Sequence, residues 1–235
     1  MNDLINPHNL SALDIDVDAE LAQMLEGVRM HLPRVRIDHS PSGRHRMFVD
    51  YGPSLEADSV QVDVLDNVLH GIVLQHQFIR AIFTEGETLP TCASVDGIPT
   101  VDAPKSATCA TCPHQAFGSI CKPKVRLLVL NPDRNANQPL ILFNLSPTSI
   151  KRWHRYVQRL ARSQVPYLVV LTTFTLDNIK RPPYRCAEVD FTATRLVTQE
   201  ELAWVKEARG ALGHALNQIV QDDYAEPGDA TDVQS

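Results

Sequence analysis

Short runs rich in apolar and β-branched residues recur through the middle of this chain, and one of them, Val60–Leu65, alternates cleanly with polar residues as a half-buried strand does. They predict strands at Arg44–Tyr51, Val60–Leu65, Arg126–Leu130, Leu140–Leu145, Pro166–Leu176 and Tyr184–Arg195. The apolar run Ile72–Phe83 fits either a strand or a helix. Turn-forming segments separate the third strand from the fourth and the fifth from the sixth, which predicts two hairpins.

Three segments instead repeat apolar residues every three or four positions, as amphipathic helices do. The first runs from Asp18 to about Leu32, and the second begins at Ser146 or Thr148, either of which can cap it. The third opens with the capping box Thr198–Glu201. The expected buried positions are Ile150, Trp153, Val157 and Leu160 in the second helix, and Leu202, Val205, Leu212, Leu216 and Ile219 in the third.

The order of these elements shows no strict strand–helix alternation and no internal repeat. It predicts an α+β protein built on a small antiparallel sheet or a partly open barrel, with flanking helices. We expect an N-terminal acidic segment and helix at residues 1–43 and a core at 44–220, with a cysteine loop inserted at 86–123. The polar, acidic residues 221–235 are expected to form a disordered tail.

Charge is distributed unevenly along the chain. The 235 residues have a net charge of −6, yet residues 1–26 contain six acids and residues 221–235 contain five, with no Lys or Arg in either segment. Residues 105–185 instead contain thirteen Lys or Arg and only two acids, which gives this block a charge of +11. Such a block attracts a polyanion within a screening length of about 8 Å.

Composition also limits the class of protein. A hydrophobic content of 43% supports a folded core, and no apolar run approaches the length of about 18 residues that spans a membrane. The N-terminal residues lack the basic and apolar regions of a signal peptide, and the clustered cysteines suit a reducing compartment. We therefore expect a soluble cytoplasmic protein with no membrane partner.

The cysteine loop carries the most specific pattern. Cys109 and Cys112 form a C-x2-C pair, with Cys92 before it and Cys121 after it. Four thiolates at this spacing suit structural Zn²⁺, whose binding supplies about 10 kcal/mol or more of folding free energy to a segment poor in apolar residues. Free thiols and disulfides are the alternatives, and His114 could replace one cysteine as a ligand.

Catalytic signatures are absent. The chain contains no phosphate-binding loop, dinucleotide fingerprint, nucleophile elbow or H-E-x-x-H motif, and its C-x2-C pair lacks the preceding proline and H-x-E partner of zinc deaminases. Four thiolates would also leave zinc no open position for a catalytic water. We do not expect an enzyme. A zinc nuclease or deaminase stays open only if three protein ligands and a water hold the metal.

The basic block offers what a single-strand binding surface needs, cations for phosphates and aromatic rings for bases. The candidate phosphate contacts are Lys122, Lys124, Arg126, Lys151, Arg152, Arg155, Arg159, Lys180, Arg181 and Arg185. The candidate stacking residues are Phe117, Tyr156 and Tyr184, for which packing is the alternative. The acidic tail could compete with nucleic acid, recruit partners or keep the protein soluble.

Three segments carry a resemblance to a known family: Cys92–Pro99, Cys109–Ser119 and Cys121–Lys122. They read C-A-S-V-D-G-I-P, C-A-T-C-P-H-Q-A-F-G-S and C-K, and L-S-P-T-S-I-K-R-W-H-R-Y-V and V-V-L-T-T-F-T-L downstream are similar as well. The chain resembles phage-encoded single-stranded-DNA-binding (helix-destabilising) proteins over about Val60 to Ala208. This resemblance implies an OB-fold, a zinc subdomain and an acidic C-terminus. The best-known members bind zinc through one His and three Cys, whereas this chain offers four Cys.

These observations predict a single-stranded DNA-binding protein, largely independent of sequence, for phage-type DNA replication or recombination in the cytoplasm of a bacterial host. Its tail would engage replication or recombination proteins. The alternative is a protein-interaction adaptor or inhibitor of a host replication, transcription or nuclease complex. A basic groove lined with aromatic rings would favour DNA, and a flat basic helix with buried aromatic residues would favour the adaptor. RNA stays open as a ligand beside DNA.

Overall fold

The computed structural model describes residues 32–38, 45–53, 60–65, 67–87, 89–116, 118–132, 140–181, 184–211 and 223–224. Contacts divide the chain into two units, Met1–His31 and Leu32–Ser235. All described residues belong to the second unit. The predicted N-terminal helix therefore lies outside them, apart from its last residue, Leu32.

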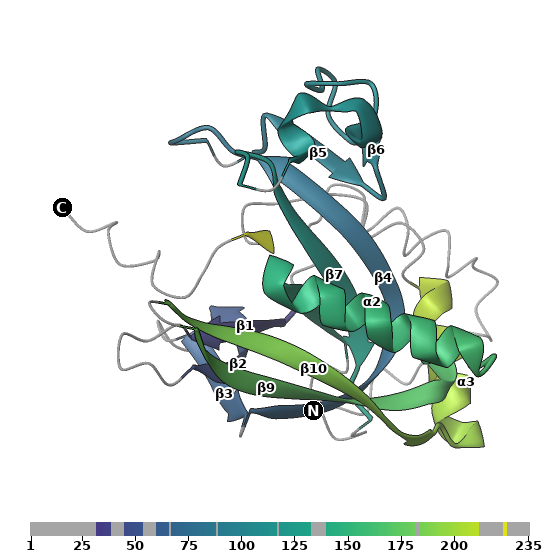
Figure 1. The fold of residues 1–235 in the computed structure, drawn as a ribbon. Coiled ribbons are helices and arrows are strands. Elements are labelled where there is room, and N and C mark those ends of the chain that lie inside the picture. The colour runs from purple at the N-terminus through teal and green to yellow at the C-terminus, as the bar shows by residue number, and fades with distance from the viewer. Residues whose placement is uncertain are drawn as a thin grey trace, which may run out of the picture. The chain divides into compact units, whose positions relative to one another are not determined.

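The described residues form a ten-stranded sheet (Figure 1). Its strands are β1 (Arg34–Asp38), β2 (Arg46–Pro53), β3 (Val60–Leu65), β4 (Val68–Ile82), β5 (Cys92–Val95), β6 (Ile98–Pro99), β7 (Lys122–Leu130), β8 (Leu140–Leu145), β9 (Val170–Arg181) and β10 (Tyr184–Leu196). The main order is β10-β9-β4-β7-β8-β1-β2-β3, while β5 pairs with β4 and β6 with β5. Pairing is antiparallel except between β1 and β8, which run parallel.

Strand β4 spans Val68–Ile82, so the run Ile72–Phe83, which fitted either a strand or a helix, is a strand up to Ile82. The sheet bends along this strand. The first residues of β4 pair with β9 and the rest with β7, and a register shift between Val73 and Gln75 marks a bulge that increases the twist. A side chain at Gly71 would place its Cβ 2.2 Å from Cγ1 of Val129, so this close approach requires glycine. The result is a mixed α+β architecture with a curled, half-barrel sheet, compatible with an OB-like fold (Figure 1).

Two α-helices occur in the described part of the chain, α2 (Pro147–Arg162) and α3 (Gln199–Ala211). They pack on opposite faces of the sheet, because β7 is apolar on both. Leu127 and Val129 belong to the core under α2, and Leu128 and Leu130 to the core with Val205 of α3. We call these faces the α2 face and the α3 face.

The core under α2 is rich in aromatic residues. Trp153 and Tyr156 of the helix pack with Phe143, Phe174 and Phe191 of the sheet, and all five side chains are fully buried. The predicted stripe of α2 is therefore confirmed, with Tyr156 added to it. Residues 153 and 156 share a helix face because they are three positions apart.

The capping box at the start of α3 is confirmed. The backbone N–H of Glu201 donates to Thr198 Oγ1 at 3.1 Å, and the N–H of Thr198 donates to Glu201 Oε2 at 2.7 Å. Val205 is buried as expected and Leu202 is half-buried. The other predicted inward positions, Leu212, Leu216 and Ile219, lie outside the described residues.

Several strand predictions need correction, and β5 and β6 are among them because they lie within the predicted cysteine loop 86–123. Strand β1 was not predicted, although Arg34–Asp38 alternates polar and apolar residues as R-V-R-I-D; β2 and β8 pair with it on both sides. The run predicted to begin at Pro166 forms a 3-10 turn at Tyr167–Val169 first, and β9 begins at Val170.

Candidate functional site

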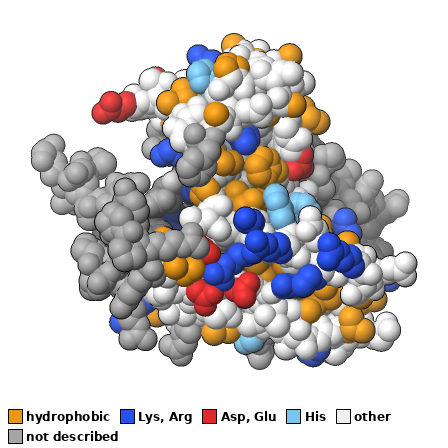
Figure 2. Space-filling view, in the orientation of Figure 1, with side chains coloured by type: hydrophobic (Ala, Val, Ile, Leu, Met, Phe, Trp, Pro, Cys, Tyr) orange, Lys and Arg blue, Asp and Glu red, His pale blue; other side chains and the backbone are white. Residues whose placement is uncertain are grey.

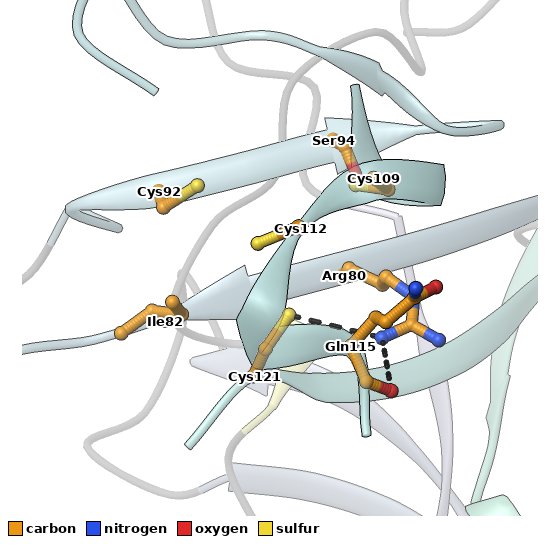
Figure 3. A pocket seen from close by; sticks show the side chains of 8 residues that line it. All are labelled: Arg80, Ile82, Cys92, Ser94, Cys109, Cys112, Gln115 and Cys121. Atoms are coloured by element: carbon orange, nitrogen blue, oxygen red, sulfur yellow. Dashed lines mark hydrogen bonds between the residues drawn. The ribbon is translucent and has the colours of Figure 1, made fainter. Parts of the chain in front are cut away.

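The four clustered cysteines line one small pocket beyond the end of β4 (Figure 3). Cys92 opens β5 opposite Ile82, and Cys121 immediately precedes β7. Cys109 and Cys112 flank a 3-10 turn in the segment between them. The pocket volume is about 20 Å³, room for one water-sized sphere. Arg80, Ile82, Ser94 and Gln115 complete the lining.

Hydrogen bonds hold the segment around this pocket. The thiol of Cys109 lies 3.0 Å from Ser94 Oγ, and its backbone N–H donates to the carbonyl of Gly97 at 3.3 Å. Nη1 of Arg80 donates to the Gln115 carbonyl at 3.4 Å and lies 4.0 Å from Sγ of Cys121. Burial raises the pKa of the Cys121 thiol, while the neighbouring Arg80 acts in the opposite direction.

The donor chemistry of this pocket fits zinc, since four sulfurs from one loop and two strand ends surround it. None of the five cysteines forms a disulfide, and His114 is not among the lining residues. Among the described residues, no three His, Cys, Asp or Glu side chains stand close enough together to hold a metal ion as they are. The zinc assignment therefore stays a proposal, which the convergence of the four thiols supports.

Helix α2 presents an exposed basic surface. Lys151, Arg155, Arg159 and Arg162 are exposed, and Figure 2 shows Lys and Arg side chains gathered over α2. We call these four residues the basic surface of α2. Arg152 differs from them, because its guanidinium contacts Glu188 at 2.9 Å and Asp177 at 2.6 Å. Two carboxylates already satisfy Arg152, so its charge is less available to a phosphate.

The predicted stacking role of Tyr156 is wrong in this structure. Its side chain is 1% exposed, and its hydroxyl contacts Thr172 Oγ1 at 2.7 Å inside the core. A base cannot reach a ring that is covered on both faces. Of the other candidates, Phe117 lies outside the described residues. For Lys180, Arg181, Tyr184 and Arg185 the structure describes the backbone, as ends of β9 and β10, and not the side chains.

Arg126 and Lys124 of β7 lie on the α3 face. There they contact Asp223, a residue of the predicted disordered tail. Asp223 is 1% exposed and accepts from Nη1 of Arg126 at 3.2 Å and from Nη1 of Arg34 at 2.7 Å. Nζ of Lys124 donates to its backbone carbonyl at 3.1 Å, and the amide of Asn144 donates to it as well. The prediction of a disordered tail over 221–235 is therefore wrong at Asp223, because its buried carboxylate pairs with the guanidinium groups of Arg126 and Arg34.

Tyr224 extends this contact. Its ring lies 5.5 Å from the ring of Phe83 and 4.9 Å from Nζ of Lys124. Arg126 is 3% exposed and also donates to Oε1 of Gln77 at 2.7 Å, so it is closed to solvent in this state. Burial lowers the pKa of Arg126, and the charge of Asp223 opposes that shift. Only Lys122, which is exposed, remains open among the three predicted contacts of β7.

Sequence reasoning missed three residues on the α2 face of β4. His76, Phe78 and Arg80 alternate along the strand, so their side chains share one face, between α2 and the cysteine pocket. His76 is exposed and lies 5.5 Å from the ring of Tyr167. Partial desolvation of the ring against Trp153 and Tyr167 lowers the pKa of His76, while the charge of Asp96 raises it and His154 lowers it. The sequence already places His76, Phe78 and Arg80 at every second position. This spacing indicates a shared face only if Ile72–Phe83 is a strand, and the sequence left that open.

Comparison of the chain with protein family models, with curated proteins and with solved structures gives no match. Neither α2 nor α3, the helices in the described part of the chain, is long and apolar enough to cross a membrane.

Proposed function

We propose that this protein binds single-stranded DNA without strong sequence preference, in phage-type replication or recombination. The observation that carries the proposal is the juxtaposition on the α2 face. The basic surface of α2 lies beside a strand face that exposes His76 and leaves Phe78 half-buried. Cations that neutralise phosphates beside rings that accept bases form the usual surface of single-strand binders.

We also propose that the cysteine pocket holds structural Zn²⁺, which makes the segment 86–123 a zinc loop inserted into an OB-like core. Cys92, Cys109, Cys112 and Cys121 would be the ligands. Four thiolates fill the tetrahedral sites of zinc, so the metal would stabilise the loop and would have no place for a reacting water. This is consistent with a binding protein rather than an enzyme.

The adaptor hypothesis keeps one observation in its favour. The aromatic residues of α2 itself, Trp153 and Tyr156, are buried, so the helix alone is a basic face without rings. Such a face suits an acidic protein partner as well as a nucleic acid. The difference between the two functions therefore lies in whether the β4 residues take part in binding.

The test is fluorescence anisotropy of labelled oligo-dT at two salt concentrations. We expect submicromolar binding that weakens steeply with salt, because phosphate contacts release counterions. A chain ending at Tyr224 should bind more tightly than the full chain, since it lacks Glu226, Asp229 and Asp232 but keeps the Asp223 contact. The cut must lie beyond Tyr224, because a chain ending before Asp223 would also lose its contacts with Arg34 and Arg126.

Failure to bind single-stranded DNA or RNA at low salt would contradict the proposal. In that case the adaptor becomes the better function. A pull-down with the wild-type chain and with a variant of the basic surface of α2 would then identify the acidic partner.

A further inference from the structure

Phe78 is connected to the cysteine pocket through its backbone. Its N–H donates to Oδ1 of Asp96 at 2.7 Å, and its carbonyl accepts from the N–H of Asp96 at 2.8 Å. Asp96 and Gly97 form the tight turn between β5 and β6, both with positive φ, of 49° and 83°. The carbonyl of Gly97 in turn accepts from the N–H of Cys109. The backbone at Phe78 is therefore two hydrogen-bonded steps from the C-x2-C pair.

The ring of Phe78 makes a second connection to the cysteine pocket, through its contact with Arg80. The guanidinium of Arg80 lies 5.3 Å from the centroid of the Phe78 ring. The same guanidinium lines the cysteine pocket, where it contacts Cys121 and the Gln115 carbonyl (Figure 3). A planar guanidinium can lie over a ring and still donate from its edge.

The surface around this pair suits a nucleobase. Phe78 and Arg80 are both half-buried, which leaves part of each side chain open between α2 and the lobe that carries β5 and β6. Figure 2 shows hydrophobic surface between that lobe and the Lys and Arg side chains over α2. A base stacked on the Phe78 ring would leave its phosphates within the field of the basic surface of α2.

Zinc with four thiolates carries a net charge of about −2, so the bound metal would favour the position of Arg80 beside the sulfurs. We propose that Arg80 is a positioning residue that couples the cysteine pocket to a base-stacking site on Phe78. Metal in the pocket holds Arg80, and Arg80 with the Asp96 turn holds the Phe78 ring where a base of single-stranded DNA stacks. This inference rests on the proposed function and adds a site and a linkage to it.

Linkage makes the inference measurable, because coupling between two ligands is reciprocal. If zinc orders the stacking site, then oligo-dT must raise the affinity for zinc. The experiment is competition for zinc between the full chain and a coloured chelator, with and without saturating oligo-dT. We expect oligo-dT to raise the zinc affinity of the wild-type chain about fivefold or more.

Two variants assign that coupling to residues. Arg80→Gln should still bind one zinc per chain, yet lose the effect of oligo-dT on zinc affinity and bind oligo-dT about tenfold more weakly. Phe78→Leu leaves Arg80 and the thiols in place, so its zinc affinity without DNA should equal that of the wild type. Its affinity for oligo-dT should fall about tenfold, and the coupling should disappear.

Matched controls separate this role from general damage. Phe83→Leu removes a half-buried ring that contacts Tyr224 on the α3 face, and Lys206→Gln removes an exposed charge on α3. Both should keep the wild-type coupling. If Arg80→Gln does not fold, Phe78→Leu alone decides the result.

The outcomes distinguish the inference from the proposed function. A wild-type chain that binds oligo-dT and zinc independently, or variants that retain the coupling, would overturn the inference and leave the proposed function intact. A chain that binds oligo-dT but no zinc would overturn the inference together with the zinc proposal, and would leave the proposed DNA binding intact. A wild-type chain that does not bind oligo-dT would overturn both.

Discussion

Both faces of the sheet carry cationic side chains, but those on the α2 face are exposed and those on the α3 face are paired with a carboxylate. On the α2 face, the cations of the basic surface of α2 are open to solvent. On the α3 face, Arg34 and Arg126 are drawn into contact with one buried carboxylate, Asp223. Only the first set can meet a phosphate without a rearrangement. Counting Lys and Arg along the chain treats the two sets as equal, whereas burial and pairing separate them.

The largest effect is expected when the carboxylate of Asp223 is removed. Asp223→Ala would leave the buried guanidinium of Arg126 and the half-buried guanidinium of Arg34 without this carboxylate, and breaking a buried ion pair typically costs about 3–5 kcal/mol. We expect the free energy of unfolding, measured in urea, to fall by about 3 kcal/mol. A chain ending at Tyr224 serves as the control and should unfold like the full chain. Equal stability of Asp223→Ala and wild type would show that the α3 face does not depend on this contact.

The α2 face should respond in the opposite way. Replacing Lys151, Arg155 and Arg162 with Gln removes three exposed cations, so stability should change by less than about 0.5 kcal/mol. Affinity for oligo-dT should fall at least tenfold, and the slope of log K against log salt should become shallower by roughly 2, at about 0.7 for each lost contact. The matched variant Lys206→Gln with Arg209→Gln, on α3, should leave binding unchanged. An unchanged salt slope in the α2 variant would place the DNA elsewhere.

The ion pair between Arg195 and Glu201 lies nearer the surface than the contact of Arg126 with Asp223, so its loss should cost less stability. Glu201 accepts two hydrogen bonds from Arg195 at 2.8 Å, which with the capping contacts lowers its pKa to about 2. A lowered pKa stabilises the folded state above the unfolded value of 4.5, and this contribution is lost as pH falls from there through 2. Glu201→Gln should cost about 1–2 kcal/mol at pH 7, because Arg195 is largely exposed.

The pH dependence checks that assignment. The difference in unfolding free energy between wild type and Glu201→Gln should be constant from pH 7 to pH 5 and should shrink below pH 4.5. A constant difference down to pH 2 would mean that Glu201 acts through packing rather than charge.

The smallest effect is expected at Tyr156, on the buried side of α2. Tyr156→Phe removes one hydrogen bond to Thr172, which typically contributes about 1 kcal/mol. Stability should fall by about that amount while affinity for oligo-dT stays the same. A clear loss of binding without a loss of stability would restore the stacking role of Tyr156 and contradict its burial.

Much of the fold followed from local patterns. The apolar runs R-L-L-V-L and L-I-L-F-N-L on either side of a turn predicted β7 and β8, and the spacing of Ile150, Trp153, Val157 and Leu160 predicted the buried side of α2. Strand β1 was missed although R-V-R-I-D alternates, because five residues with two apolar side chains are a weak signal, and pairing with β2 and β8 establishes it as a strand. The extent of the sheet and its curl depend on such pairings and on the approach of Gly71 to Val129.

The residues of the candidate site likewise fall into those that a local pattern identified and those that only long-range contacts brought together. The C-x2-C spacing and its two flanking thiols identified, from the sequence alone, the four residues that meet at one pocket, since a short loop brings its own cysteines together. Only the tertiary structure placed Arg80 beside that pocket and Phe78 beside Arg80. It also placed Asp223 on Arg34, 189 positions away in the chain. Long-range contacts leave no local pattern, because each partner alone resembles an ordinary surface charge. The sequence therefore determined which groups are present and which neighbours they bring with them, and the fold decided which charges remain open to a ligand.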